Sequence, residues 1–164
     1  MTTAVYPGSF DPITNGHLDI VGRATAVFEQ VIVAVLANPR KTPLLPVEQR
    51  IAMIEASLAG DGAAMDRLEI AAFDGLTVDF CHARGATAII RGLRAISDFE
   101  IEMQLAHNNR VLAPDLDTVF FMTSVANGYV SSSLVKEIAS FGGDVSGMIP
   151  TSVLGPLREA LERR

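Results

Sequence analysis

The chain has 164 residues, of which 49% are apolar, and a formal net charge of −6. That length allows one domain to bury a hydrophobic core, and the acidic balance disfavours duplex nucleic acid as a partner, because such binders carry a basic surface. No apolar run approaches the roughly 18 residues of a membrane span, the N-terminal residues lack signal-peptide features, and the single cysteine, Cys81, excludes an internal disulfide. We therefore expect a cytoplasmic protein with neither a nucleic-acid nor a membrane partner.

Apolar runs of strand length alternate along the chain with segments of helical periodicity. Thr14 or Asn15 suits the N-cap of the first helix, and Pro46 suits the first turn of the second. Ser97 or Asp98 suits a later N-cap. In chain order the pattern predicts a strand at 3–8, a helix at 15–30, a strand at 31–37, a helix at 46–60, a strand at 67–73, a helix at 76–85, a strand at 86–92, a helix at 97–112, a strand at 117–123, and helices at 132–143 and 156–164.

This alternation is typical of right-handed βαβ units, which build a parallel sheet. The sequence shows no internal repeat and no linker long enough to divide domains. We therefore predict an α/β fold with a Rossmann-like parallel five-stranded sheet, helices on both faces, and a single domain over residues 1–164. Ligands of such open sheets bind beyond the carboxyl ends of the strands. That edge should bring together four polar loops, at 7–16, 38–46, 91–97 and 123–133.

The first of these loops, within YPGSFDPITNGH, leads from a strand into a helix. Gly8 and Gly16 allow the backbone to approach a ligand closely, and His17 lies where a ring nitrogen could donate to a phosphate oxygen. The segment is neither a P-loop nor the dinucleotide fingerprint. The alternative is a plain strand–turn–helix junction in which His17 is only exposed.

The segment IIRGLR places Arg91 at the end of a buried strand and Arg94 three residues later. Two forked, permanently charged groups at such a position suit phosphate recognition. The alternative is a pair of surface salt bridges.

The segment NGYVSSSLVKE places Ser131, Ser132 and Ser133 at a helix N-terminus. One serine there is by default an N-cap, but three hydroxyls on the same edge as two arginines and a histidine suggest a phosphate cradle. Lys136 either faces the same site or lies on the exposed face of this helix, and we expect the exposed face. No Cys/His spacing resembles a zinc site, so no protein-held metal is predicted.

The segments YPGSFDPITNGH, IIRGLRAISDFEIEMQLAHNNR and YVSSSLVKE together closely resemble the bacterial phosphopantetheine adenylyltransferase family, within the nucleotidyltransferase superfamily that carries the (H/T)xGH motif. The resemblance runs from about residue 4 to residue 150. TNGH alone specifies the superfamily, whereas the block from Arg91 to Arg110 is more specific to this family.

The resemblance implies transfer of the adenylyl group of ATP to 4′-phosphopantetheine with Mg²⁺, which gives dephospho-coenzyme A and pyrophosphate. It also implies a homohexamer, which agrees with the wide apolar arc of the helix predicted at 97–112. Two alternatives stay open. One is a nucleotidyltransferase of the same superfamily with a nicotinamide mononucleotide or cytidylyl acceptor, and the other is a non-catalytic nucleotide-binding module.

The same resemblance assigns residues to each role. It implies as ATP-binding residues Ser9, Phe10, His17, Gly92, Leu93, Arg94, Glu102, Asn127, Gly128, Tyr129, Val130, Ser131, Ser132 and Ser133. It implies as acceptor-binding residues Ser9, Lys41, Leu76, Thr77 and Arg91, and as catalytic residues His17, Lys41, Arg91, Arg94 and Ser132. Two positions depart from the family, which often has threonine at Ser9 and a larger apolar residue such as methionine at Thr77.

The chemistry that the resemblance implies needs no general base. A phosphate monoester has a second pKa near 6, so it is mostly dianionic at neutral pH and is already a nucleophile. Positioning and charge neutralisation must then provide most of the catalysis. This agrees with the sequence, which shows no convincing Asp–His or Glu–His arrangement for a general base.

Overall fold

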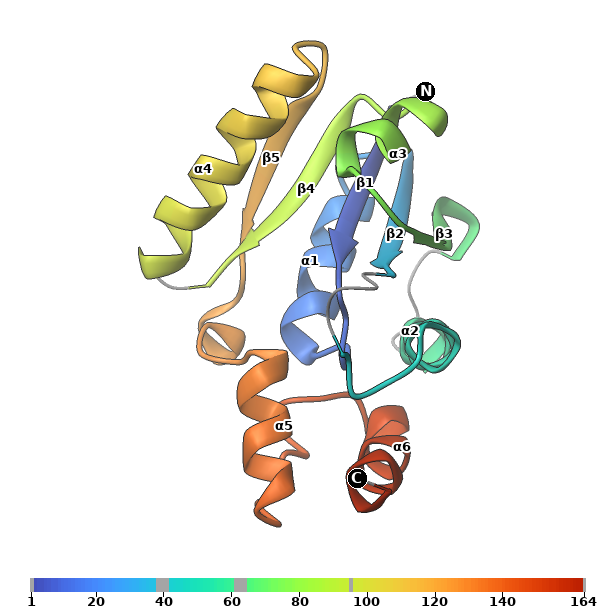
Figure 1. Ribbon diagram of the computed structural model, residues 1–164, viewed down its shortest axis with the longest axis vertical. Coiled ribbons are helices and arrows are strands. Elements are labelled where there is room, and N and C mark those ends of the chain that lie inside the picture. Colours follow the sequence, from blue (N-terminus) through green and yellow to red (C-terminus); the bar gives the residue numbers. More distant parts are fainter. Residues whose placement is uncertain (1, 38–41, 61–64, 95, 164) are drawn as a thin grey trace.

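The computed structural model describes residues 2–37, 42–60, 65–94 and 96–163. The strands form one sheet in which every neighbouring pair is parallel, in the order β3-β2-β1-β4-β5 (Figure 1). The predicted parallel five-stranded sheet is therefore confirmed. The strands are β1 (Thr3–Gly8), β2 (Gln30–Leu36), β3 (Leu68–Phe73), β4 (Ala88–Leu93) and β5 (Asp117–Met122).

The order of the strands reverses beside β1. The chain adds β2 and β3 on one side of β1 and then returns to place β4 and β5 on the other side. Ala4 of β1 pairs with both Val31 of β2 and Ala88 of β4. Ligand-binding crevices form at such a reversal, beyond the carboxyl ends of the strands. The ends of β1 and β4 are therefore where a site is expected.

Helices cover both faces of the sheet. α1 (Asn15–Thr25) and α2 (Val47–Gly60) pack on one face, and α3 (Thr77–Ala83) and α4 (Ile96–Leu112) pack on the other. α5 (Ser132–Ser140) and α6 (Thr151–Glu162) lie beyond the carboxyl ends of the strands, at the bottom of Figure 1. Two short 3-10 helices occupy Met65–Arg67 and Val125–Asn127. Among the described residues, no helix has the length and apolar character needed to cross a membrane.

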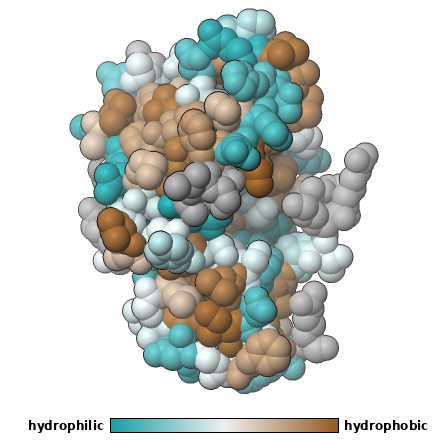
Figure 2. Space-filling model, turned by 90° about the vertical axis from the view of Figure 1, so that its left-hand side faces the viewer, coloured by the Kyte–Doolittle hydropathy of each residue, from teal (hydrophilic) through white to brown (hydrophobic). Residues whose placement is uncertain are grey.

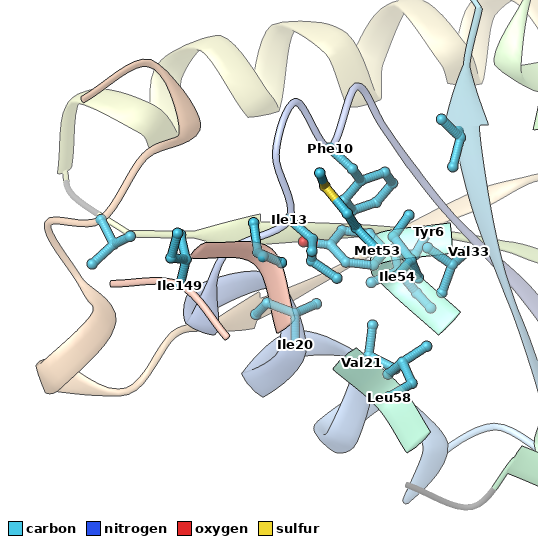
Figure 3. Close-up of a cluster of buried hydrophobic side chains, with 14 of the residues drawn as sticks. Tyr6, Phe10, Ile13, Ile20, Val21, Val33, Met53, Ile54, Leu58 and Ile149 are labelled. Atoms are coloured by element: carbon cyan, nitrogen blue, oxygen red, sulfur yellow. The ribbon is translucent and has the colours of Figure 1, made fainter. Parts of the chain in front are cut away.

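The core consists of two hydrophobic clusters, one on each face of the sheet. Successive side chains of a strand point to opposite faces. Ala4 and Tyr6 of β1 accordingly join the larger cluster, whereas Val5 joins the smaller one, which includes Cys81 of α3. Figure 3 shows how side chains from β1, α1 and α2 meet in the larger cluster, including Tyr6, Ile20, Val21, Met53, Ile54 and Leu58.

The predicted start of α4 and the predicted end of α1 were wrong. α4 begins at Ile96, so Ser97 and Asp98 lie inside its first turn and neither is the N-cap. α1 ends at Thr25 rather than at residue 30, because Gln30 already belongs to β2 and pairs with Thr3. In the second case, pairing within the sheet overrides the helical periodicity.

The C-terminal helix begins earlier than predicted. α6 starts at Thr151, five residues before the predicted start at Pro156. A proline inside a helix removes the hydrogen bond to the carbonyl four residues earlier, here Ser152. Val153 and Leu157 are nevertheless fully buried in the larger cluster. Burial of these side chains outweighs the lost backbone hydrogen bond.

Candidate active site

A cavity of about 270 Å³ lies where the carboxyl ends of β1 and β4 meet the first turns of α1 and α5. Three of the four loops predicted to meet at this edge contribute to it, namely 7–16, 91–97 and 123–133. Its lining consists of Tyr6, Pro7, Gly8, Ser9, Phe10, Thr14, Gly16, His17, Ile20, Arg91, Gly92, Arg94, Glu102, Thr123, Val130, Ser131, Ser132 and Ser133.

Most of the candidate site residues meet in this cavity, but not all of them. Leu93 is buried at the end of β4, and Asn127, Gly128 and Tyr129 lie in the loop before α5 without lining the cavity. Leu76 and Thr77 are at the start of α3, after β3, and do not line it either. Lys41 lies outside the described residues.

His17 is oriented by the N-cap of its own helix. Thr14 is the N-cap, as predicted, and its Oγ1 accepts from the His17 backbone N–H at 3.4 Å. In return, the Thr14 backbone N–H donates to Nδ1 of His17 at 3.0 Å. A backbone N–H can only donate, so Nδ1 is the acceptor and a neutral ring carries its proton on Nε2. The cap therefore sets both the orientation of the ring and its tautomer.

The His17 ring is neutral at physiological pH. Burial and the positive charges of Arg94 and Arg91 lower the pKa of His17 from 6.5 to about 4. The ring also contacts Phe10 edge-on, with 5.0 Å between the ring centroids. His17 therefore offers an oriented hydrogen-bond donor without a formal charge, and it is not merely exposed.

Gly8 also makes room for a neighbouring side chain. A Cβ at this position would lie 2.9 Å from Cζ of the Phe10 ring, and Gly8 itself lines the cavity. Phe10 has a φ of 46°, which is uncommon outside glycine, and its side chain is buried against Tyr6. Any contact of Phe10 with a nucleotide would therefore come chiefly from its backbone.

Arg91 forms a partly buried ion pair within the cavity lining. Its Nε and Nη2 donate to the two carboxylate oxygens of Glu102 at 2.5 and 2.7 Å, and Nη1 donates to the carbonyl of Pro7 at 3.4 Å. A guanidinium has five N–H donors, so two remain for a ligand. Glu102 thus orients Arg91, and the pair is part of the cavity rather than an exposed salt bridge.

The serines at the start of α5 are partly committed to the fold. Ser131 is the N-cap, as its default interpretation predicted, and its Oγ accepts from the Leu134 N–H at 3.1 Å. Ser132 Oγ donates to the carbonyl of Pro12 at 2.7 Å. The backbone N–H groups of Ser132 and Ser133 have no partner within the helix, as in any first turn. A phosphate cradle here would use these N–H groups and the Ser131 hydroxyl proton.

Arg94 connects β4 to the loop that precedes α5. Its Nη1 donates to the carbonyl of Val130 at 3.0 Å. Together with Arg91 it makes the cavity locally positive in a chain of net charge −6. Such a cavity favours anionic ligands such as phosphates.

Sequence reasoning missed three charged residues beside the cavity. Lys136 is not on an exposed face, since its Nζ donates to Oδ2 of Asp11 at 2.7 Å and its side chain is only 30% exposed. Asp11 and Arg50 are both buried. The three residues line a second cavity of about 260 Å³, which shares Ser9, Ser132 and Ser133 with the first. One signal was available, because Lys136 follows Ser132 by four residues and therefore lies on the same helix face.

Comparisons with known proteins identify relatives along nearly the whole chain. A family model described as cytidylyltransferase-like matches residues 5–138. A phosphopantetheine adenylyltransferase from Heliobacterium modesticaldum (strain ATCC 51547 / Ice1) is 51% identical over 159 residues, which cover 97% of this chain and 92% of that protein. One from Synechococcus sp. (strain JA-3-3Ab) is 53% identical over 156 residues, which cover 95% of this chain and 96% of that protein.

Solved structures confirm the predicted fold class. The nicotinic acid mononucleotide adenylyltransferase of Plasmodium falciparum, complexed with NaAD, has a TM-score of 0.70 and 13% identity, over 99% of this chain and 95% of that one. A candidate nicotinate-nucleotide adenylyltransferase from Vibrio parahaemolyticus has a TM-score of 0.71 and 16% identity, over 100% and 97%. At such identities the likeness concerns the Rossmann-like fold alone.

Proposed function

We propose that this chain, which belongs to the phosphopantetheine adenylyltransferase family, transfers the adenylyl group of ATP to 4′-phosphopantetheine. It is an adenylyltransferase of coenzyme A synthesis. The products are dephospho-coenzyme A and pyrophosphate. The observation that carries this proposal is the identity of about half of the residues over 97% of the chain. The locally positive cavity at the switch point of the sheet supports it independently.

In the proposed reaction, an oxygen of the acceptor phosphate attacks the α-phosphorus of ATP. A new P–O bond forms, the bond to the β-phosphate breaks, and pyrophosphate leaves with the bonding electrons. The acceptor is mostly dianionic at neutral pH, so no proton has to be removed from it. The main obstacle is repulsion between two polyanions, which fixed donors and positive charges reduce.

The described residues divide this work between them. We assign the Nε2–H of His17 and the guanidinium of Arg94 to the charge on the α-phosphate and the leaving pyrophosphate. The N–H groups at the start of α5 have the same role. Arg91, oriented by Glu102, holds the acceptor phosphate with its two remaining donors.

The other assignments rest on the family alone. Lys41 is proposed to hold the acceptor phosphate together with Arg91 and Ser9. Leu76 and Thr77 are proposed to border the pantetheine arm. Asn127, Gly128 and the exposed Tyr129, between β5 and α5, are proposed to contact ATP together with Gly92 and Leu93.

We also propose Mg²⁺ as the cofactor. Mg²⁺ prefers oxygen ligands and keeps several waters. The described lining residues offer hydroxyl oxygens from serines and threonines, and both oxygens of Glu102 are already bonded to Arg91. This donor set fits an ion held chiefly by phosphate oxygens and water. When bound, the ion supplies positive charge to the phosphates.

The proposed assembly is a homohexamer, supported by exposed apolar side chains of α4, which we call the α4 surface. On the face shown in Figure 2, apolar side chains lie beside hydrophilic ones, which are drawn in teal. Together with a neighbouring residue of β5, the side chains of the α4 surface are Phe99, Ile101, Met103, Leu105, Val111, Leu112 and Met122. Apolar patches of this kind mark interaction sites. The free, buried Cys81 also supports a reducing compartment, and the cytoplasm is the proposed location.

The decisive assay measures pyrophosphate release from ATP and Mg²⁺, with and without 4′-phosphopantetheine, and detects dephospho-coenzyme A by mass spectrometry. We expect product only when the acceptor and Mg²⁺ are both present. Product with nicotinamide mononucleotide instead would assign the chain to a different acceptor. ATP binding without turnover on any acceptor would favour a non-catalytic nucleotide-binding module.

A further inference from the structure

Arg50 of α2 is almost completely buried, with 2% of its surface exposed, and its guanidinium joins three parts of the chain. Nη1 donates to the carbonyls of Ser9 at 2.6 Å and Leu36 at 3.1 Å, and Nε donates to the carbonyl of Leu45 at 3.0 Å. Burial of a charged group is costly unless it is hydrogen-bonded. These three carbonyls compensate for that cost, and they connect the loop after β1, the end of β2 and the start of α2.

Asp11 forms a second set of hydrogen bonds, next to those of Arg50. Its Oδ1 accepts from the Leu45 N–H at 2.9 Å, and its Oδ2 accepts from the Leu44 N–H at 3.0 Å and from Nζ of Lys136 at 2.7 Å. Leu45 is therefore held from both sides, through its N–H by Asp11 and through its carbonyl by Arg50. The buried side chains of Asp11 and Arg50 therefore both bind the backbone of the segment 44–45.

These hydrogen bonds connect to the candidate active site at two places, Ser9 and the first turn of α5. The Arg50 guanidinium fixes the backbone of Ser9, which lines the cavity. α5 is bound to the loop after β1 at two points, from Ser132 to the Pro12 carbonyl and, one turn later, from Lys136 to Asp11. The separation between Ser9 and the first turn of α5 is thus set by groups that lie behind the cavity.

We propose that Asp11, Arg50 and Lys136 are positioning residues, which hold Ser9 and the first turn of α5 in the geometry that the two reacting phosphates require. This inference rests on the proposed adenylyl transfer. Asp11 and Lys136 act as one unit, because each is the other's charged partner. Misplacing reacting groups by about 1 Å can cost on the order of 100-fold in rate. Loss of the Asp11–Lys136 ion pair should therefore lower kcat, while the KM values for ATP and the acceptor stay within about twofold of the wild-type values.

The test is a double-mutant cycle of Lys136→Met and Asp11→Asn, with Lys136→Arg as the conservative variant. We expect each single variant to lower kcat about 10- to 100-fold, and the double variant to lose no more than the worse single variant, because both break one interaction. Lys136→Arg should recover most of the rate. The matched control is Arg84→Met, which breaks the Arg84–Glu69 ion pair away from the cavity and should leave kcat unchanged.

Two results would overturn the proposal. If Lys136→Met raised KM for ATP or the acceptor more than it lowered kcat, while Asp11→Asn had no effect, Lys136 would bind a phosphate directly. Multiplicative losses in the double variant would show that the two residues act separately.

Hydrogen exchange separates this inference from the proposed function. In the Lys136→Met variant, we expect faster amide exchange at the first turn of α5 and at Leu44 and Leu45, but not in the Arg84→Met control. That readout needs no turnover. If the wild-type protein formed no dephospho-coenzyme A, the proposed function would be wrong. If amide exchange were unchanged in Lys136→Met, the positioning role of Lys136 would be refuted.

Discussion

The segment from Gly8 to His17 and the α4 surface differ in which side chains they bury. The first buries polar side chains, whereas the second exposes apolar ones. In the first, the buried polar side chains of Asp11 and Thr14 are hydrogen-bonded, as the Thr14–His17 cap and the three partners of Asp11 show. Among the described residues, no buried side-chain nitrogen or oxygen lacks a hydrogen-bond partner. On α4, by contrast, large apolar side chains such as Ile101 are exposed.

A single chain can satisfy the hydrogen bonds around the cavity, but it leaves the apolar α4 surface exposed to water. Satisfied buried polar groups form a rigid scaffold, so the donors around the cavity are oriented before any ligand arrives. An exposed apolar surface is stabilised only when another surface removes it from water. We therefore treat the cavity as a property of one chain and the α4 surface as the basis of the proposed assembly.

The largest effect should come from His17→Ala. Loss of a preorganised donor at the reacting phosphate lowers kcat by on the order of 100-fold or more. Steady-state kinetics with ATP and 4′-phosphopantetheine would measure this. The matched control is His82→Ala, since His82 is exposed and pairs with Asp115 away from the cavity. Turnover near the wild-type rate in His17→Ala would remove His17 from the mechanism.

The α4 surface is tested by Ile101→Glu. A charge in a buried apolar contact is strongly unfavourable, so we expect multi-angle light scattering to show a smaller assembly than the wild-type protein forms. Val27→Glu is the control, because Val27 is 63% exposed, close to the 61% of Ile101, but lies outside the surface of α4. A monomeric wild-type protein at micromolar concentration would contradict the hexamer.

The partly buried His17 side chain predicts a pH dependence of stability. The folded pKa of His17 is about 4, below its ordinary value of 6.5, so the unfolded chain binds more protons between these values. Stability from the neutral ring is then fully present above pH 6.5 and is lost as pH falls towards 4. Between pH 7 and pH 5 it amounts to about 2 kcal/mol.

Chemical denaturation at both pH values would measure this loss in the wild-type protein. The His17→Ala variant should show a smaller loss, because it lacks the group that titrates. Equal losses in the two proteins would mean that the pKa of His17 is not lowered in the fold.

Paired glycine substitutions test the packing around Phe10, and the smallest effect should come from Gly22→Ala. Gly8→Ala places a Cβ against the Phe10 ring, so we expect a loss of about 1–3 kcal/mol in the free energy of unfolding. Gly22→Ala, within α1, meets no atom within 4 Å and should stabilise the protein by about 0.5–1 kcal/mol. Thermal and denaturant unfolding would compare the two. Similar changes in both variants would refute the role assigned to Gly8.

Features that depend on near neighbours could be predicted from the amino-acid sequence. Thr14 and Ser131 cap their helices through groups three residues away, and β1 follows from one continuous run at Thr3–Gly8. The strand–helix alternation then leads to a parallel sheet, because right-handed crossovers leave few other arrangements. The meeting of His17, Arg91 and the serines at one edge follows from that topology.

The partners of the buried charged groups, by contrast, could not be predicted before the chain was seen folded. Lys136 reaches Asp11 across 125 positions of the chain, and Arg50 reaches Ser9 across 41. Periodicity places a side chain on a face of its own helix, but it does not show what lies opposite that face. The early start of α6 ahead of Pro156 has the same origin, because burial against other elements outweighs the local preference of the backbone. Local hydrogen bonds can be predicted from adjacent residues, whereas burial and charge pairing exist only after distant segments have packed together.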